Sequence, residues 1–133
     1  MAFIPAIHVP TSKARKLLPE SIPHNDAVKN SINTALLTQA LTNRPDLLVA
    51  ATEDYLHQSY RESAMPKSHA LMQKLRAAGV AAFISGAGPT VLTLLVDADL
   101  NHELEDLVRA AGSGFAVENL EISRVGYQVS NIL

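Results

Sequence analysis

Residues 81–96, AAFISGAGPTVLTLLV, carry the clearest signal for the fold. Two short apolar runs, residues 80–84 and 91–96, flank the polar segment SGAGPT, which contains two glycines and a proline. Short, partly β-branched runs separated by turn residues are typical of two strands joined by a tight loop. We therefore expect a strand–loop–strand corner that exposes backbone N–H groups at its tip.

A glycine-rich loop allows backbone N–H groups to approach an anion closely. The pattern GxxxxGK[ST] is absent, which excludes a P-loop. A dinucleotide-binding turn would need a third glycine and a following helix, but Val91 occupies that place and a strand is expected to follow. Two interpretations stay open: a corner that grips a small polar ligand or a phosphate, and a hairpin turn that simply requires glycine.

The residues before this corner predict one strand and several helices. A strand is expected at residues 2–4, ending near Pro5 or extending to Val9. A short helix over residues 13–18 would be capped by Thr11 or Ser12. Longer helical patterns begin at three prolines and place apolar residues on one face. The first begins at Pro23 and has Val28, Ile32, Ala35, Leu36 and Ala40 on its apolar face. The second begins at Pro45 and either ends before residue 53 or continues through residues 53–60. The third begins at Pro66 and ends near Gly79.

After the corner, the pattern predicts another helix and a last strand. Asp99 can cap a helix whose apolar stripe runs from Leu100 to Ala111. The C-terminal residues alternate through Leu120 and Ile122, and then through Val125, Tyr127 and Val129. The change of phase predicts a bulge near residues 123–124.

Without the additional helices, the order is β-α-β-β-α-β, the ferredoxin-like arrangement. We predict an α+β fold over residues 1–133: an antiparallel four-stranded sheet, helices packed on one face, and extra helices inserted after strand 1.

Composition limits the functional classes. The chain has 133 residues, 47% of them apolar, which fits one domain with a real core. Eleven Lys and Arg balance 13 Asp and Glu without a basic run, so a nucleic-acid interface is not expected. There is no cysteine, so disulfides, thiolate metal sites and a catalytic thiol are excluded, as suits a cytoplasmic protein. No membrane span, signal peptide or metal site is expected from the apolar runs, the N-terminal residues or the histidine spacing.

Five motifs carry a resemblance to a known family. The loop SGAGPT after an apolar strand resembles the C-terminal motif of the GHMP kinases, which phosphorylate small molecules. Four further stretches resemble motifs of one group within that family, the homoserine kinases, and occur in the same order. These are TSKAR with LP (residues 11–15 and 18–19), IPHNDAVKN (22–30), RPDLL (44–48) and EDYLHQSYR (53–61), in which Tyr55 stands where the family usually has arginine.

The resemblance implies roles for particular residues. Arg15 and Arg61 would bind the carboxylate of an amino-acid substrate, because a guanidinium offers parallel N–H donors. Thr11 would lie near the reacting hydroxyl, and Gly86 would offer its backbone amide to the substrate. The neighbouring loop residues Ser85, Ala87, Gly88 and Thr90 would contribute to the same substrate or phosphate loop. Each assignment has an alternative interpretation. Arg15 and Arg61 could form ordinary surface ion pairs, which is also what we expect of the remaining arginines. Thr11 could serve only as an N-cap, and the loop could be only a tight turn.

The resemblance also implies what the chain would work with. GHMP kinases use ATP and Mg²⁺, held mainly by an N-terminal domain with a glycine- and serine-rich phosphate loop. Since no such loop is present here, we expect these residues to form the C-terminal domain alone, inactive by itself and with its N-terminal domain as partner. Its partly apolar docking face would then be exposed and could support a homo-oligomer.

The resemblance predicts substrate binding for ATP-dependent phosphorylation of the homoserine hydroxyl to O-phosphohomoserine, in threonine biosynthesis. The alternatives are a non-catalytic ferredoxin-like module that binds an amino acid or a partner, and a GHMP kinase for another small molecule.

Overall fold

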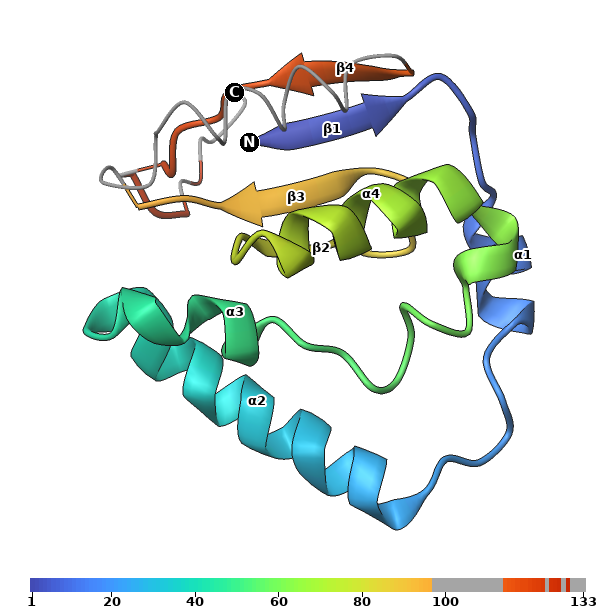
Figure 1. Cartoon of the computed structure of the whole chain (residues 1–133), viewed down its shortest axis with the longest axis horizontal. Helices are drawn as coiled ribbons and strands as arrows, with labels where there is room; N and C mark the ends of the chain where they lie inside the picture. The colour runs from blue at the N-terminus through green and yellow to red at the C-terminus, as the bar shows by residue number, and fades with distance from the viewer. Residues whose placement is uncertain (97–113, 124, 128, 130–133) are drawn as a thin grey trace.

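The computed structural model describes residues 1–96, 114–123, 125–127 and 129 (Figure 1). Its elements, in chain order, are β1 (Ala2–Pro5), α1 (Thr11–Lys16), α2 (His24–Thr42), the 3₁₀ turn η1 (Pro45–Leu47), α3 (Leu48–Ala51), the 3₁₀ turn η2 (Glu62–Ala64), α4 (Pro66–Ala77), β2 (Ala81–Ile84), β3 (Val91–Leu94) and β4 (Phe115–Glu118). All the helices in this series lie between β1 and β2, so the prediction of extra helices after the first strand is confirmed.

The strands form one four-stranded sheet in the order β2-β3-β1-β4, and each neighbouring pair is antiparallel. The corner predicted from residues 81–96 is the β2–β3 hairpin, with Ile84 opposite Val91. The predicted α+β class with an antiparallel four-stranded sheet is therefore confirmed. The helix predicted from Asp99 onward lies outside the described residues.

Helices cover both faces of the β2 edge, which corrects the prediction that they pack on one face. Ala82 belongs to the larger core cluster, together with Leu71 and Leu75 of α4. The adjacent Ala81 belongs to a second cluster that contains Ala40 of α2 and residues of α3. Successive side chains of a strand point to opposite faces, so the two clusters lie on opposite sides of β2. In Figure 1, α4 lies against β2 and β3, whereas α2 and α3 lie apart from α4.

Two helix boundaries show how well the sequence signals worked. Gly79 follows α4 with φ +82°, the left-handed conformation expected of a glycine that ends a helix. The predicted cap of the first helix is wrong: Pro10 is the N-cap of α1, and Thr11 is its first helical residue. Pro10 has no side-chain acceptor, and its carbonyl oxygen accepts the Lys13 and Ala14 N–H groups over 2.9 and 3.1 Å.

The last strand lies earlier than the alternating residues predicted. β4 is Phe115–Glu118, and the described residues from Leu120 to Val129 are exposed and form no strand. The reason is register: Glu118 lies opposite Ala2, so β1 has almost no backbone left to pair with later residues. Alternation alone does not make a strand where no partner edge exists.

The predicted continuation of helix through residues 53–60 is also wrong. The chain leaves α3 at Ala51 and runs through turns until η2. Asp54 explains the change, because its carboxylate accepts hydrogen bonds from three following backbone amides and replaces helical pairing there. Among the described residues, no helix is long and apolar enough to cross a membrane.

Candidate functional site

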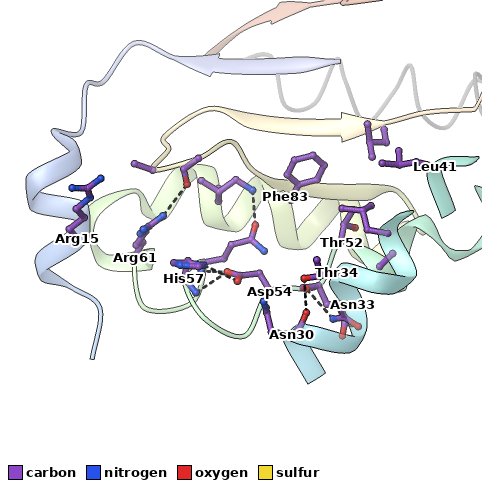
Figure 2. A pocket seen from close by; sticks show the side chains of 18 of the residues that line it. Arg15, Asn30, Asn33, Thr34, Leu41, Thr52, Asp54, His57, Arg61 and Phe83 are labelled. Atoms are coloured by element: carbon purple, nitrogen blue, oxygen red, sulfur yellow. Dashed lines mark hydrogen bonds and ion pairs between the residues drawn. The ribbon is translucent and has the colours of Figure 1, made fainter. Parts of the chain in front are cut away.

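A cavity of about 770 Å³ lies between α1, α2, the loop after α3 and the β2–β3 hairpin (Figure 2). One part of its wall is polar and the other is apolar. Charged and polar groups from α1, the loop and the hairpin tip form one part, and apolar side chains form the other, among them Leu37 and Leu41 of α2 and Phe83 and Leu94 of the sheet. Such a cavity suits a small ligand with a charged end.

The structure brings most of the predicted site residues to this cavity. Thr11 and Arg15 of α1, Arg61 of the loop, and Gly86 and Ala87 of the hairpin tip all line it. Three predicted residues of the loop, Ser85, Gly88 and Thr90, do not line it. Predicted residues from three distant parts of the sequence therefore line the same cavity.

The two arginines differ in their surroundings. Arg61 is 8% exposed, and its Nη1 donates a hydrogen bond to the Gly86 carbonyl oxygen over 2.9 Å. Its Nε is buried and has no hydrogen-bond partner in the structure. Arg15 is exposed, and its guanidinium makes no hydrogen bond or ion pair within the described part of the chain. A buried donor without a partner is costly, so Arg61 is suited to accept an anion as its missing partner.

The hairpin tip uses some of its amides internally. The Ser85 N–H donates to the Thr90 carbonyl and the Gly88 N–H donates to the Ser85 carbonyl, both over 2.9 Å. Gly86 has φ +57° and Gly88 φ +82°, conformations that favour glycine. Of the amides at 85–88, those of Gly86 and Ala87 have no partner in the described structure, so only these two are open to a ligand.

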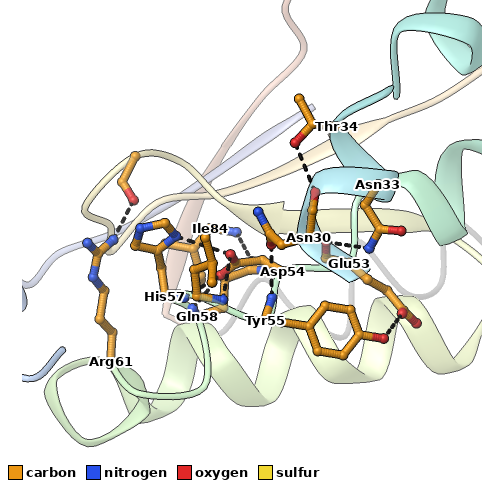
Figure 3. Close-up of polar contacts among 12 residues, drawn as sticks. Asn30, Asn33, Thr34, Glu53, Asp54, Tyr55, His57, Gln58, Arg61 and Ile84 are labelled. Atoms are coloured by element: carbon orange, nitrogen blue, oxygen red, sulfur yellow. Dashed lines mark hydrogen bonds and ion pairs between the residues drawn. The ribbon is translucent and has the colours of Figure 1, made fainter. Parts of the chain in front are cut away.

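Asp54 organises the loop that carries Arg61 (Figure 3). Its Oδ1 accepts the Leu56 N–H and approaches His57 Nδ1, both over 3.1 Å. Its Oδ2 accepts the His57 N–H over 2.9 Å and the Gln58 N–H over 2.6 Å. Sequence analysis missed Asp54, although an aspartate that bonds amides two to four residues ahead is a known turn former.

Further hydrogen bonds fix this loop to its surroundings. Gln58 is buried, and its Oε1 accepts the Ile84 N–H at the end of β2 over 2.6 Å. On the other side, Asn30 Oδ1 accepts the Tyr55 N–H and Asn33 Nδ2 donates to the Glu53 carbonyl. The loop is thus tied to both α2 and the sheet. Asn30, Asn33 and Gln58 contact residues far away in the chain, so no local pattern indicates these roles.

Arg76 differs from the surface ion pair expected of an arginine outside the predicted site, because its side chain is only 13% exposed. Its guanidinium donates to the Val49 carbonyl over 2.7 Å, and to Thr52 Oγ1 and the Ala82 carbonyl over 3.0 Å. These bonds join α4 to α3 and β2. Arg44 forms an exposed ion pair with Asp46, with Nη2 and Oδ2 2.7 Å apart.

Tyr55, which stands where the family usually has arginine, lies on the outer side of the same loop. Its hydroxyl donates to Glu53 Oε2 over 2.7 Å, and this hydrogen bond raises the pKa of Tyr55. Lys29 Nζ lies 4.9 Å from the ring centroid. These contacts add to the anchoring of the loop on α2.

The described residues contain no group of three or more His, Asp or Glu side chains placed to hold a metal ion. Asp54 already accepts four hydrogen bonds, and Glu53 is engaged by Tyr55 and by Arg76 at 3.6 Å.

Residues 32–114 match the model of the family described as GHMP kinases C terminal. The chain belongs to this family.

The relatives are more specific. The chain is 50% identical over 129 residues to a homoserine kinase of Streptomyces avermitilis, a match that covers 97% of this chain and 41% of that protein. It is 46% identical over 129 residues to a homoserine kinase of Mycolicibacterium vanbaalenii, covering 40% of it. A crystal structure of homoserine kinase from Cytophaga hutchinsonii superposes with a TM-score of 0.68 and 25% identity, covering 83% of this chain and 34% of the other. The chain thus corresponds to a C-terminal portion of homoserine kinase and spans about 40% of the length of these curated relatives.

Proposed function

We propose that this chain is the substrate-binding C-terminal domain of a homoserine kinase that phosphorylates the homoserine hydroxyl to O-phosphohomoserine with ATP, a step of threonine biosynthesis. One observation carries the proposal: in a chain half identical to homoserine kinases, Thr11, Arg15, Arg61 and Gly86 line one cavity. The small size of the substrate fits the charged part of that cavity.

The two arginines act on the substrate carboxylate. Arg15 offers a guanidinium that has no partner in the described structure, and Arg61 offers a buried Nε beside the hairpin tip. Charge-assisted hydrogen bonds of this kind fix the orientation of a carboxylate. Thr11 lies one helical turn before Arg15 on the same face of α1. Its hydroxyl is therefore available to the hydroxyl end of the substrate, away from the carboxylate.

Phosphoryl transfer depends mainly on positioning and on neutralising charge. ATP and Mg²⁺ supply the phosphoryl group and its charge compensation when bound. The described residues provide neither a phosphate loop nor a metal-ligand group, so we assign the nucleotide and the ion to an N-terminal domain. The contribution of this chain is to hold the hydroxyl in place, to orient the carboxylate and, through the Gly86 and Ala87 amides, to bind negative charge.

We also propose that the fold is ferredoxin-like. The observed strand order, β2-β3-β1-β4 with antiparallel neighbours, supports this arrangement. The fold alone does not distinguish a kinase domain from a non-catalytic binding module.

The test is a chimera in which this chain replaces the matching segment of the Streptomyces avermitilis homoserine kinase, assayed by ADP release. We expect homoserine-dependent turnover, whereas the 133-residue chain alone should show none at an ordinary enzyme rate. Arg15→Ala should raise the KM for homoserine about tenfold to a hundredfold, as expected for a lost charge-assisted bond. Arg44→Ala, which removes an exposed arginine outside the cavity, is the matched control. A folded chimera without homoserine-dependent turnover, or an Arg15→Ala chimera with unchanged KM, would reject the proposal.

A further inference from the structure

His57 is a cavity residue to which neither the sequence motifs nor the proposal above assigned a role. Its side chain is 44% exposed and lines the cavity, and its Nδ1 lies 3.1 Å from Asp54 Oδ1. The Asp54 carboxylate fixes the imidazole and favours the tautomer with hydrogen on Nδ1, because a carboxylate can only accept. In that tautomer Nε2 is a hydrogen-bond acceptor.

His57 also lies beside the arginine that we assign to the substrate carboxylate. The Arg61 N–H donates to the His57 carbonyl over 3.2 Å, so one turn of chain separates the two residues. Residues four apart in such a turn have side chains on the same side. In Figure 2, His57 lies between Arg61 and Asp54, whereas Asn33 lies farther along α2.

An amino acid carries its ammonium group on the same carbon as its carboxylate. An acceptor for the ammonium must therefore lie next to the arginines that hold the carboxylate. The oxygens of Asp54 are unsuitable, because each already accepts two hydrogen bonds. Glu53 is held by Tyr55 and Arg76, and the Asn30 oxygen by the Tyr55 N–H. His57 Nε2 has no other partner in the described structure, and the cavity residue Asn33, whose amide oxygen is also unpaired, lies farther along α2.

We propose that His57 recognises the α-ammonium group of the substrate through Nε2, with Asp54 as the positioning residue behind it. This inference rests on the proposed function. The negative charge of Asp54 strengthens Nε2 as an acceptor, and it also offsets the repulsion that the ammonium group meets from Arg15 and Arg61. The site thereby distinguishes an amino acid from a hydroxy acid of the same length.

The test uses the chimera described above and two ligands, L-homoserine and 4-hydroxybutyrate, which differ only in the ammonium group. The quantity measured is the ratio of the inhibition constant of 4-hydroxybutyrate to the KM for homoserine. His57→Leu should lower this ratio about tenfold, because it weakens homoserine binding and leaves the hydroxy acid unaffected. His57→Gln, which retains an acceptor oxygen, should recover part of the ratio. His24→Leu changes a histidine outside the cavity and should leave the ratio unchanged.

A purely structural histidine would weaken both ligands equally and keep the ratio constant, which would overturn the inference. If the variants do not fold, ¹⁵N-histidine NMR on the unsubstituted chimera decides the question. Homoserine should shift the Nε2 resonance of His57, and 4-hydroxybutyrate should not; equal shifts, or none, contradict the proposal. If the chimera turns over homoserine but fails these tests, only the role of His57 is rejected. If the chimera shows no turnover, the proposed kinase function itself is rejected.

Discussion

Both the backbone conformation at position 88 and the neighbouring side chains favour glycine there. Its φ is +82°, and a Cβ at this position would lie 2.5 Å from Met65 Sδ and 3.0 Å from Ile84 Cγ2. Met65 is 1% exposed, so the flexible end of its side chain would have to shift within the core to make room for a Cβ. The glycine is thus required for packing, although it does not line the cavity.

Gly88→Ala should lower the free energy of unfolding by about 2–4 kcal/mol, as the sum of backbone strain and overpacking. Gly79→Ala is the matched control: it has the same φ but no atom within 4 Å, and should cost about 1–2 kcal/mol. Urea unfolding of both variants measures the difference. Equal losses would show that the contact with Met65 is not significant.

Asp46 gives a prediction about pH. The hydrogen bonds from Arg44, over 2.8 and 2.7 Å, hold the pKa of Asp46 below its ordinary range. A lowered pKa means that the pair favours the folded state above the pKa of the unfolded chain, and that this contribution disappears as the pH falls through the folded value. Both groups are exposed, so the effect on stability is small.

We therefore expect NMR titration to find Asp46 ionised to lower pH than a free aspartate, and Arg44→Gln to return it toward the ordinary value. Overall stability should hardly change in that variant. A pKa of Asp46 that does not respond to the substitution would contradict the ion pair.

Among the secondary-structure elements, the loop after α3 takes its local conformation from the hydrogen bonds of one carboxylate, that of Asp54. Asp54→Ala removes the acceptor of three backbone amides and should cost about 1–2 kcal/mol, comparable with the loss of a helix cap. Amide hydrogen exchange at His57 and Gln58 should accelerate, while exchange in α4 stays slow. Asp54→Asn keeps an oxygen for these amides and should have a smaller effect. Unchanged exchange in Asp54→Ala would mean that the ties to α2 and β2 suffice to hold the loop.

Elements with strong local signals were predicted well. Proline at the start and glycine after the end located α4, and apolar runs around SGAGPT located β2 and β3. The loop at 53–61 and β4 were predicted incorrectly. The conformation of the loop depends on side-chain acceptors for its backbone amides. The position of β4 depends on the limited length of its partner strand β1.

At the scale of the whole molecule, the predicted apolar stripe of α2 is mostly uncovered. Ala40 is buried, but Val28 and Ile32 are 42% and 58% exposed. The periodicity correctly predicted a helix, yet no described element packs against most of that face. The sequence therefore predicted the helix but not the environment of its apolar side.

The exposed face should make the chain self-associate as its concentration rises. Ile32→Glu should weaken association about tenfold, because it removes apolar area and adds like charges to the contact. Ser31→Glu, at a neighbouring exposed polar position, is the control for charge. Sedimentation velocity over a wide concentration range measures both, and a monomer at every concentration would contradict the prediction.

The lining of the cavity could be predicted in part. Motifs identified Thr11, Arg15, Arg61 and Gly86, which do line one cavity, because the motifs contain these residues themselves. The supporting residues Asn30, Asn33 and Gln58 were not found, since their partners lie 20 or more residues away. Their roles follow from tertiary structure alone.

The position of β1 has a consequence for the order of folding. β1 lies inside the sheet, between β3 and β4, and the backbone at Met1 meets Thr93, 92 residues further on. By contrast, α4, β2 and β3 are consecutive and contact one another locally. Closing a long loop costs entropy before its contacts form, so we expect the α4–hairpin unit to assemble early. The N-terminal strand β1 would then be among the last elements to join the sheet. It would insert between β3 and β4, which both follow it by many residues in the sequence.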